Sequence, residues 1–256
     1  MKEQLNYGTQ IWEFEDVDIL IEEFLDLYEK RPIQNNKGGM LSAHLFWVWY
    51  VIKKLKPKNI IESGIFKGQG TWLFRQTCPE AKIFSIDPAL EQRQYVDKTV
   101  TYFTDDFSFI DWKQYLDVKE TFIFFDDHQN AYNRLMQMKW MGFSQAMFED
   151  NYPENRGDCY SLKKVFAECG FQGNYIVPPN TAHANYVKKN IETYTTFPPL
   201  YRSEKTRWGD EWDNDTYLTA DSILSREKIE KYSVIQEEAK SYTWICYIKL
   251  KTTRIL

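Results

Sequence analysis

Acidic side chains and one histidine follow two very apolar segments of this sequence. TFIFFDDHQNAY places Asp126, Asp127 and His128 after an apolar run, and SQAMFEDNYP places Glu149 and Asp150 after the next one. Each run has the composition and length of a buried strand. Because parallel strands end at one edge of a sheet, we expect these side chains to meet there. Clustered carboxylates repel one another unless a cation or protons neutralise them, and oxygen ligands suit Mg²⁺ or Mn²⁺.

An alternative without a metal is open for each of these residues. A single strand-end acid can cap the following helix or face water. Acids after two neighbouring strands favour the metal site. A lone histidine is more often structural than catalytic, but His128 lies among the expected ligands, and a neutral imidazole can accept a proton near pH 7. We therefore expect His128 to act as a base.

A glycine-rich stretch, IIESGIFKGQGTW, joins an apolar strand to a predicted helix. It contains Glu62, Gly64, Gly68 and Gly70. The spacing is not GxGxxG, which disfavours NAD, but glycines at such a turn let the backbone approach a ligand. A tight turn without a ligand is the alternative. Asp87, at the end of the next strand in KIFSIDP and roughly 20 residues on, is placed to accept the hydroxyls of a ribose, which favours a cofactor.

These stretches resemble a known family. IIESGIFKGQGTW and FSIDP resemble motifs I and II of class I S-adenosylmethionine-dependent methyltransferases, over residues 59–250 apart from a long insertion. The resemblance implies that Glu62 and the glycines Gly64, Gly68 and Gly70 surround the methionine part of the cofactor, and that Asp87 holds its ribose. It also implies that the segment after the third strand lies near the adenine, where the candidates are Asp105, Asp106 and Phe107.

The strand-end acids resemble those of divalent-metal-dependent O-methyltransferases, most closely the cephalosporin hydroxylase-like and macrocin O-methyltransferase-like branch. The resemblance implies that Asp126 is the first metal ligand and that Glu149 and Asp150 are the following pair. Asp127 competes with Asp126 for the first place and is kept as a catalytic candidate. Catechol-type enzymes carry a lysine three residues past the first ligand, where this chain has Gln129. A divalent ion would act as template and Lewis acid, with the histidine removing the proton.

Strand and helix patterns alternate along the chain, which predicts an α/β fold. We expect a Rossmann-like, mostly parallel sheet with helices on both faces, preceded by helices near residues 17–30 and 41–55. YSVIQEE and YTWICYIKL predict a C-terminal antiparallel hairpin. We expect a single domain with N-terminal helices (1–56), a cofactor and metal core (57–169), an acceptor lid (170–231) and the hairpin (232–256).

The expected lid is long for a connection, which is typical of a binding element. Its interleaved aromatic and basic side chains suit a sugar ring or base and a phosphate or carboxylate. Alternatively, the aromatic residues pack the lid onto the domain or form an oligomer contact. The acceptor candidates are Tyr201, Arg202, Arg207, Trp208 and Trp212. The upstream NNKGGM, residues 35–40, is interpreted as a link between two helices rather than a flap over the cofactor.

Composition limits the remaining possibilities. The 256 residues carry a formal net charge of -5, which argues against general nucleic-acid binding. Four cysteines without CxxC spacing favour a reduced, intracellular protein. The first 20 residues carry acids where a signal peptide needs an apolar core, and no later segment has the length of a membrane span. We expect a cytoplasmic protein without membrane insertion and with a possible homo-oligomeric state.

Together these features predict an O-methyltransferase that uses S-adenosylmethionine and Mg²⁺ or Mn²⁺. The expected acceptor is a small polar molecule such as a sugar, a nucleotide sugar or a surface-polysaccharide precursor. Two alternatives are a hydroxylase-like oxidoreductase with the same fold and a catalytically silent cofactor-binding protein. The acids lack the two-histidine-one-carboxylate pattern of a non-haem iron oxygenase, which disfavours the first.

Overall fold

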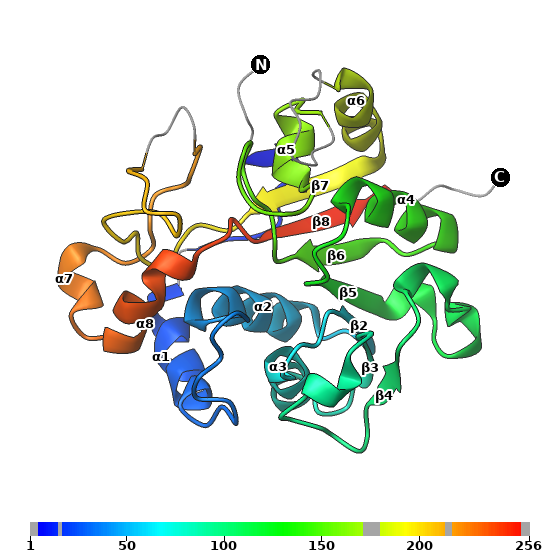
Figure 1. Cartoon of the computed structure of the whole chain (residues 1–256), viewed down its shortest axis with the longest axis horizontal. Coiled ribbons are helices and arrows are strands. Elements are labelled where there is room, and N and C mark those ends of the chain that lie inside the picture. Colours follow the sequence, from blue (N-terminus) through cyan, green and yellow to red (C-terminus); the bar gives the residue numbers. More distant parts are fainter. Residues whose placement is uncertain (1–4, 15–16, 171–179, 213–216, 252–256) are drawn as a thin grey trace.

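One mixed β-sheet forms the centre of the molecule (Figure 1). The computed structural model describes residues 5–14, 17–170, 180–212 and 217–251. The strands from β6 to β4 pair in parallel, whereas β8, β7 and β1 pair antiparallel. This arrangement confirms the expected α/β, Rossmann-like fold class. In spatial order the strands are β1 (Asn6–Gly8), β7 (Ile191–Thr196), β8 (Cys246–Leu250), β6 (Gln145–Phe148), β5 (Thr121–Phe125), β2 (Asn59–Ser63), β3 (Lys82–Ile86) and β4 (Thr101–Phe103).

Helices lie on both faces of the sheet (Figure 1). Side chains of α1, α2, α3, α7 and α8 pack in one core with Ile60 and Phe124, and those of α4, α5 and α6 pack in a second core with Ile61 and Phe125. Neighbouring strand residues point to opposite faces, which explains why these central strands are apolar throughout. The helices are α1 (Val17–Tyr28), α2 (Ser42–Leu55), α3 (Gln69–Thr77), α4 (Ala131–Met141), α5 (Leu162–Phe166), α6 (Thr181–Asn190), α7 (Arg226–Ile229) and α8 (Ser233–Glu238).

The register of the parallel strands brings their carboxyl ends to one edge. Ser63, the last residue of β2, is paired with Ile86 on one side and with Phe125 on the other. Phe125 is in turn paired with Phe148 at the end of β6. The residues that follow these ends therefore emerge side by side, as the sequence predicts.

The antiparallel end of the sheet contains a different partner strand from the one expected. β8 lies within YTWICYIKL, but its neighbour is β7, which belongs to the range expected as a lid. YSVIQEE instead contains α8. Ile235 of α8 is buried, and Glu238 accepts hydrogen bonds from the Tyr28 hydroxyl (3.0 Å) and the Ser42 backbone N–H (2.8 Å). These contacts bind the segment to α1 and α2, so tertiary packing determines its helical state.

The described part of the expected lid also contributes α6 to the second core. Residues 171–179 and 213–216 of that range lie outside the described residues. Among the residues that the structure describes, no helix combines the length and apolar character needed to cross a lipid bilayer.

Candidate functional site

The glycine loop between β2 and α3 packs closely against the ends of two strands. Gly64 has φ +96°, and a Cβ atom there would lie 2.0 Å from the backbone oxygen of Asp126. A Cβ atom at Gly70 would lie 2.4 Å from Oε1 of Glu62. Glycine is needed at both positions because any side chain would displace the strand-end residues.

Glu62 is fully enclosed beneath this loop. Its side chain is buried, and its Oε2 accepts hydrogen bonds from the hydroxyls of Thr71 (2.5 Å) and Ser85 (2.6 Å). Burial raises the pKa of Glu62 to about 7, although the two hydroxyl hydrogen bonds act in the opposite direction. The carboxyl group can therefore change its protonation state near neutral pH.

Asp87 holds the glycine loop in this structure. Its Oδ2 accepts from the backbone N–H groups of Ile65 and Phe66, both at 2.9 Å, and its Oδ1 accepts from that of Ala89 at 2.8 Å. Both carboxylate oxygens thus have backbone partners; the two lone-pair sites of Oδ2 are used, and Oδ1 retains one for another donor. The role of Asp87 toward a ribose stays a prediction.

The three candidates for adenine contact lie in different environments. Asp105 is exposed, whereas Phe107 is completely buried in the second core, where its ring packs against Trp112. Asp106 forms hydrogen bonds of 3.0 and 2.6 Å with the guanidinium of Arg134, which lowers the pKa of Asp106. In this arrangement only Asp105 offers a free side chain, and an adenine contact stays a prediction for all three.

A small cavity lies between the glycine loop and the segment before α2. It has a volume of about 10 Å³, room for about one water molecule, and is bordered by Asn36, Glu62, Gly64, Gln69 and Asp126 among others. Within the described chain, Oδ1 of Asn36 and both polar atoms of the Gln69 side chain are buried without a hydrogen-bond partner. Buried polar groups are normally paired, so such atoms point to a polar ligand in this cavity.

Asn36 and Gln69 are not among the residues predicted from the sequence. Gln69 stands between two glycines of the loop, so its position is a usable signal. Asn36 belongs to NNKGGM, which was interpreted as a link between helices. Its burial beside the loop favours the alternative, in which this segment covers the cofactor site.

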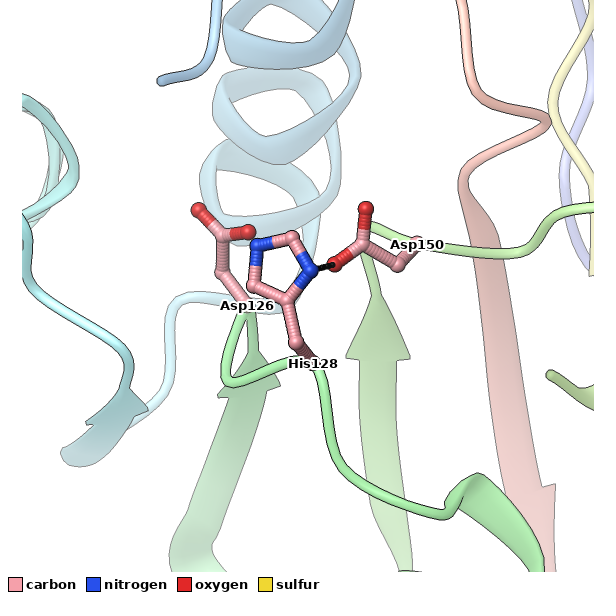
Figure 2. Close-up of side chains that lie close together, drawn as sticks. All are labelled: Asp126, His128 and Asp150. Atoms are coloured by element: carbon pink, nitrogen blue, oxygen red, sulfur yellow. Dashed lines mark ion pairs between the residues drawn. The ribbon is translucent and has the colours of Figure 1, made fainter. Parts of the chain in front are cut away.

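Acids from the ends of β5 and β6 meet around one histidine. Asp126, His128 and Asp150 each offer a ligand atom within 4.8 Å of the others, an arrangement able to hold a metal ion (Figure 2). Nδ1 of His128 lies 3.2 Å from Oδ2 of Asp150, and Figure 2 shows the other ring nitrogen facing Asp126. Asp150 is 8% exposed, and its Oδ2 makes no well-aligned hydrogen bond within the described chain.

The electrostatics of this cluster are unfavourable for charged acids. Burial raises the pKa of Asp126 well above its ordinary value, and the charges of Glu149 and Asp150 raise it further. Burial likewise raises the pKa of Asp150, with further contributions from the charge of Glu149 and a hydrogen bond to it. A divalent cation would remove this repulsion, and the oxygen-rich donor set fits Mg²⁺ or Mn²⁺. The residues present therefore fit such an ion.

Asp127 points away from this cluster. Its Oδ2 accepts hydrogen bonds from the Ser63 hydroxyl (2.7 Å) and from Nε of Arg134 (3.0 Å). These contacts bind the start of the β5–α4 connection to β2 and α4. Of the two adjacent aspartates, Asp126 is therefore the one that faces the other acids, and a catalytic role of Asp127 stays a prediction.

His128 is held by a second acid that the sequence did not indicate. Nδ1 of His128 lies 3.0 Å from Oδ1 of Asp158, and His128 has a positive φ of 52°. Burial of the ring lowers the pKa of His128, but the charges of Asp150 and Asp158 outweigh it, and the net shift is upward. Asp158 lies in the irregular segment after β6, where no sequence pattern fixes its partner.

A second histidine reaches the acids from α2. His44 is 2% exposed, and its Nδ1 lies 2.9 Å from Oε1 of Glu149. Burial, and secondly the positive charge of Arg207, lowers the pKa of His44 to about 3, so the ring is neutral. Nothing in the sequence pattern separates His44 from the apolar residues around it in α2.

Most of the expected acceptor residues pack within the protein. Trp208 stacks on the buried Trp244, with ring centroids 5.9 Å apart, and Nε1 of Trp212 donates to the backbone oxygen of Ser203 (2.8 Å). Arg202 donates to two backbone oxygens, at Thr219 and Ala220, and the ring of Tyr201 is partly buried against the first core. These contacts agree with the alternative in which the aromatic residues pack the segment onto the domain.

Arg207 is the member of this group that reaches the acids. Its Nη1 donates a 3.2 Å hydrogen bond to the hydroxyl of Tyr152, which in turn is hydrogen-bonded to Asp150. Arg207 is exposed, so its remaining guanidinium donors are open to a ligand beside the metal-ligand candidates.

Comparisons with known proteins give distant structural likenesses. No protein-family model matches the chain, and no curated protein matches it in sequence. The "CmcI-N160 apo-structure" is 15% identical over 75% of this chain and 80% of its own, with a TM-score of 0.41. An "O-methyltransferase from Bacillus cereus in complex SAH" is 14% identical over 67% and 77%, also with a TM-score of 0.41.

A third solved structure, "cmcI-D160 Mg-SAM", is 18% identical over 58% of this chain and 72% of its own, with a TM-score of 0.37. Likenesses this distant do not by themselves show a shared function, so the function has to be argued from the chain's own residues.

Proposed function

We propose that this protein is an S-adenosylmethionine-dependent O-methyltransferase that uses a divalent cation. The observation that carries the proposal is the position of Asp126. Asp126 borders the cavity beneath the glycine loop and also belongs to the acid cluster with His128 and Asp150. A cofactor bound at the loop and an acceptor bound at the cluster would therefore meet at one residue.

The cavity supports the cofactor part of this proposal. Unpaired polar atoms of Asn36 and Gln69 and the acid Glu62 surround it, which suits the amino and carboxylate groups of a methionine moiety. Its volume of about 10 Å³ holds about one water molecule, which is too small for a methionine moiety or a whole nucleoside cofactor. Binding therefore requires the 35–40 segment or the glycine loop to move outward.

The cluster supports the metal part. The proposed ligands are Asp126, Glu149 and Asp150; the first and last belong to the group of ligand atoms within 4.8 Å of one another, and Glu149 lies outside that group. The buried Oδ2 of Asp150 has no well-aligned hydrogen bond within the described chain, and its neighbour at 3.2 Å is Nδ1 of His128. When bound, the cation supplies a template and a Lewis acid for acceptor oxygens, and the sulfonium of the cofactor supplies an activated methyl group. The chain's own contribution is alignment of the acceptor and removal of its proton.

His128 is the proposed proton acceptor. Its ring lies between Asp126 and Asp150, and Asp158 fixes the orientation of Nδ1, which leaves the other nitrogen toward the cluster (Figure 2). A base held by a carboxylate in this way is oriented and made more basic. An acceptor hydroxyl would lose its proton to this nitrogen as its oxygen takes up the methyl group.

The acceptor proposed here is a small polar molecule, with sugars, nucleotide sugars and surface-polysaccharide precursors as the preferred class. Support for this class now rests on Arg207 and Tyr152 beside the acids, because Trp208 and Trp212 pack against Trp244. A guanidinium at this place suits an acceptor with a phosphate or carboxylate.

The first test is calorimetric titration of S-adenosylhomocysteine and S-adenosylmethionine into metal-free protein, repeated with Mn²⁺. We expect micromolar dissociation constants. Incubation with labelled S-adenosylmethionine and a panel of sugars and nucleotide sugars should then give labelled product that EDTA suppresses. Cofactor binding without transfer to any acceptor would indicate a silent binding protein, and absence of cofactor binding would refute the proposed function.

A further inference from the structure

His44, in α2, contacts the candidate metal ligand Glu149 at the carboxyl end of β6. It lies in the first turn of a helix in which residues 42–52 are all buried. Its Nδ1 is 2.9 Å from Oε1 of Glu149, and both side chains are almost completely enclosed, with 2% and 8% of their surfaces exposed. At this depth the contact is shielded from water; it joins a neutral ring to the carboxyl group, and its geometry is not that of a well-aligned hydrogen bond.

The protonation of the ring is set by Thr243. The backbone N–H of Thr243 donates to Nε2 of His44 at 3.1 Å. A backbone N–H can only donate, so Nε2 carries no proton, and in the neutral ring the proton is on Nδ1. His44 therefore presents an N–H to the Glu149 carboxylate rather than a lone pair.

Several contacts hold the backbone and the side chain of Glu149. Among the described residues, His44 is the one that presents a ring N–H to its carboxylate. The backbone N–H of Glu149 donates to the oxygen of Phe125 (2.9 Å), and its backbone oxygen accepts from the Thr243 hydroxyl (2.7 Å). Its Oε1 lies 2.9 Å from Nδ1 of His44 and also accepts a 3.3 Å hydrogen bond from the Thr243 hydroxyl. Without His44 the glutamate would keep the longer contact with Thr243 and lose the shorter one, so more of its rotamers would be open.

We propose that His44 is a positioning residue, which orients Glu149 toward Asp126 and Asp150 so that the three carboxylates can hold a divalent cation. The inference rests on the proposed function, because it needs the cation. It extends that function to a residue which contacts neither the cofactor cavity nor the other two acids. Partners of metal-ligating side chains typically change metal affinity by about 10–100-fold when removed.

The test compares two variants of His44 that differ in a single donor. His44→Asn keeps an N–H donor near the place of Nδ1, whereas His44→Leu removes it. Both lose the acceptor for the Thr243 N–H, so that loss cancels in the comparison. Mn²⁺ affinity is measured from the electron paramagnetic resonance of free Mn²⁺, and S-adenosylhomocysteine affinity in EDTA reports whether the cofactor cavity is intact.

We expect His44→Leu to weaken Mn²⁺ binding by about 10–100-fold and His44→Asn to stay within about threefold of the wild type. Cofactor affinity in EDTA should be unchanged in both. If His44→Leu does not fold, His44→Gln replaces it, because its amide oxygen can accept from Thr243 while the donor near Nδ1 is lost.

Two results would overturn the inference alone: wild-type Mn²⁺ affinity in the variants without the donor, or an equal loss in His44→Asn and His44→Leu. If the wild type binds the cofactor but not Mn²⁺, the metal part of the proposed function fails together with this inference. If it binds neither, the whole proposed function fails.

Discussion

The backbone of Gly64 lies against the backbone of Asp126, so closely that a Cβ atom at position 64 would stand 2.0 Å from the Asp126 oxygen. Gly64→Ala should therefore destabilise the protein by about 3 kcal/mol or more, from the positive φ and the collision together. Urea denaturation measures this change. Gly209→Ala is the control, because Gly209 also has a positive φ (+84°) but no atom within 4 Å of its Cβ position, and it should cost about 1 kcal/mol. Equal losses of stability in the two variants would mean that the close approach of Gly64 to Asp126 does not make the substitution more costly.

The raised pKa of Glu62 predicts that the stability of the protein depends on pH. The pKa of Glu62 is raised from 4.5 to about 7 in the folded protein, so between these values the folded state binds more protons than the unfolded state. Stability must then fall as pH rises through this window, by as much as about 3 kcal/mol from this residue. Glu62→Gln keeps an oxygen for the hydroxyls of Thr71 and Ser85 and should remove this part of the fall.

The measurement is the free energy of unfolding of both proteins at pH 5 and pH 7.5 in EDTA. Asp126 and Asp150 also have raised pKa values and contribute to both proteins. Because the charge of Glu62 is one of the causes that raise the pKa of Asp126, the difference between the two proteins reports Glu62 together with this coupling. Parallel pH profiles would contradict a raised pKa for Glu62.

His128 should be distinguishable among the three histidines of the chain by nuclear magnetic resonance. Burial lowers the pKa of His44 to about 3 and also lowers that of His183, whereas the net shift of His128 is upward. One imidazole should therefore titrate above the ordinary value in metal-free protein. Asp158→Asn should lower this pKa, because the hydrogen bond and the charge of Asp158 both raise it. An unchanged titration would show that Asp158 does not act on the ring.

Asp150→Asn should abolish metal binding while raising the stability of the metal-free protein. The substitution removes one of several mutually repelling acids, so the metal-free variant should be about 1–2 kcal/mol more stable than the wild type. Mn²⁺ at about 100 times its dissociation constant should stabilise the wild type by about 2.7 kcal/mol and leave the variant unchanged. Thermal unfolding with Mn²⁺ or EDTA measures both effects.

Asp158→Asn is the matched control for this experiment, since Asp158 also neighbours His128 but its side chain is 68% exposed. It should retain the response to Mn²⁺. A variant at Asp150 that still responds to Mn²⁺ would remove this residue from the metal site.

Asn36→Ala and Gln69→Ala should each weaken S-adenosylhomocysteine binding by about tenfold, because each removes one or more buried polar atoms that have no protein partner. Stability should change little in Gln69→Ala for the same reason, whereas Asn36→Ala also loses the buried hydrogen bond from Nδ2 to the Met40 backbone oxygen (2.9 Å) and should cost about 1 kcal/mol. Calorimetry measures the affinity, with Asn35→Ala as the control, since Asn35 is the exposed neighbour of Asn36. Unaltered affinity in both variants would place the methionine end of the cofactor elsewhere.

His128→Ala distinguishes its two possible roles in the cluster. If His128 acts only as a base, the variant should bind Mn²⁺ within a few-fold of the wild-type affinity. If His128 is a metal ligand together with Asp126 and Asp150, the variant should lose Mn²⁺ binding. Free Mn²⁺ measured by electron paramagnetic resonance decides between them. The proposed function predicts retained metal binding and lost methyl transfer.

The arrangement of the parallel strands was predictable from the sequence. Apolar runs that end in acids or glycines identify β2, β3, β5 and β6, and parallel pairing puts their ends at one edge. Thus the meeting of Asp126 with Asp150, and of Asp126 with the glycine loop, follows from local pattern and one rule of topology. The antiparallel partner of β8 was not predictable in this way, because the Val–Ile pair in YSVIQEE fits one turn of a helix as well as a strand.

The sequence by itself determined the α/β fold class, the glycine turn and the chemical character of the strand ends, because these depend on periodicity and on residue types next to one another in the chain. Tertiary structure decided which of two adjacent aspartates faces the cluster; it also buried Phe107 in the second core and packed the partly buried Trp208 against Trp244. It also brought Asn36 and His44, from the N-terminal segment, to the ends of strands far along the chain. Such contacts depend on how helices pack across a sheet edge, and no spacing within one segment encodes them.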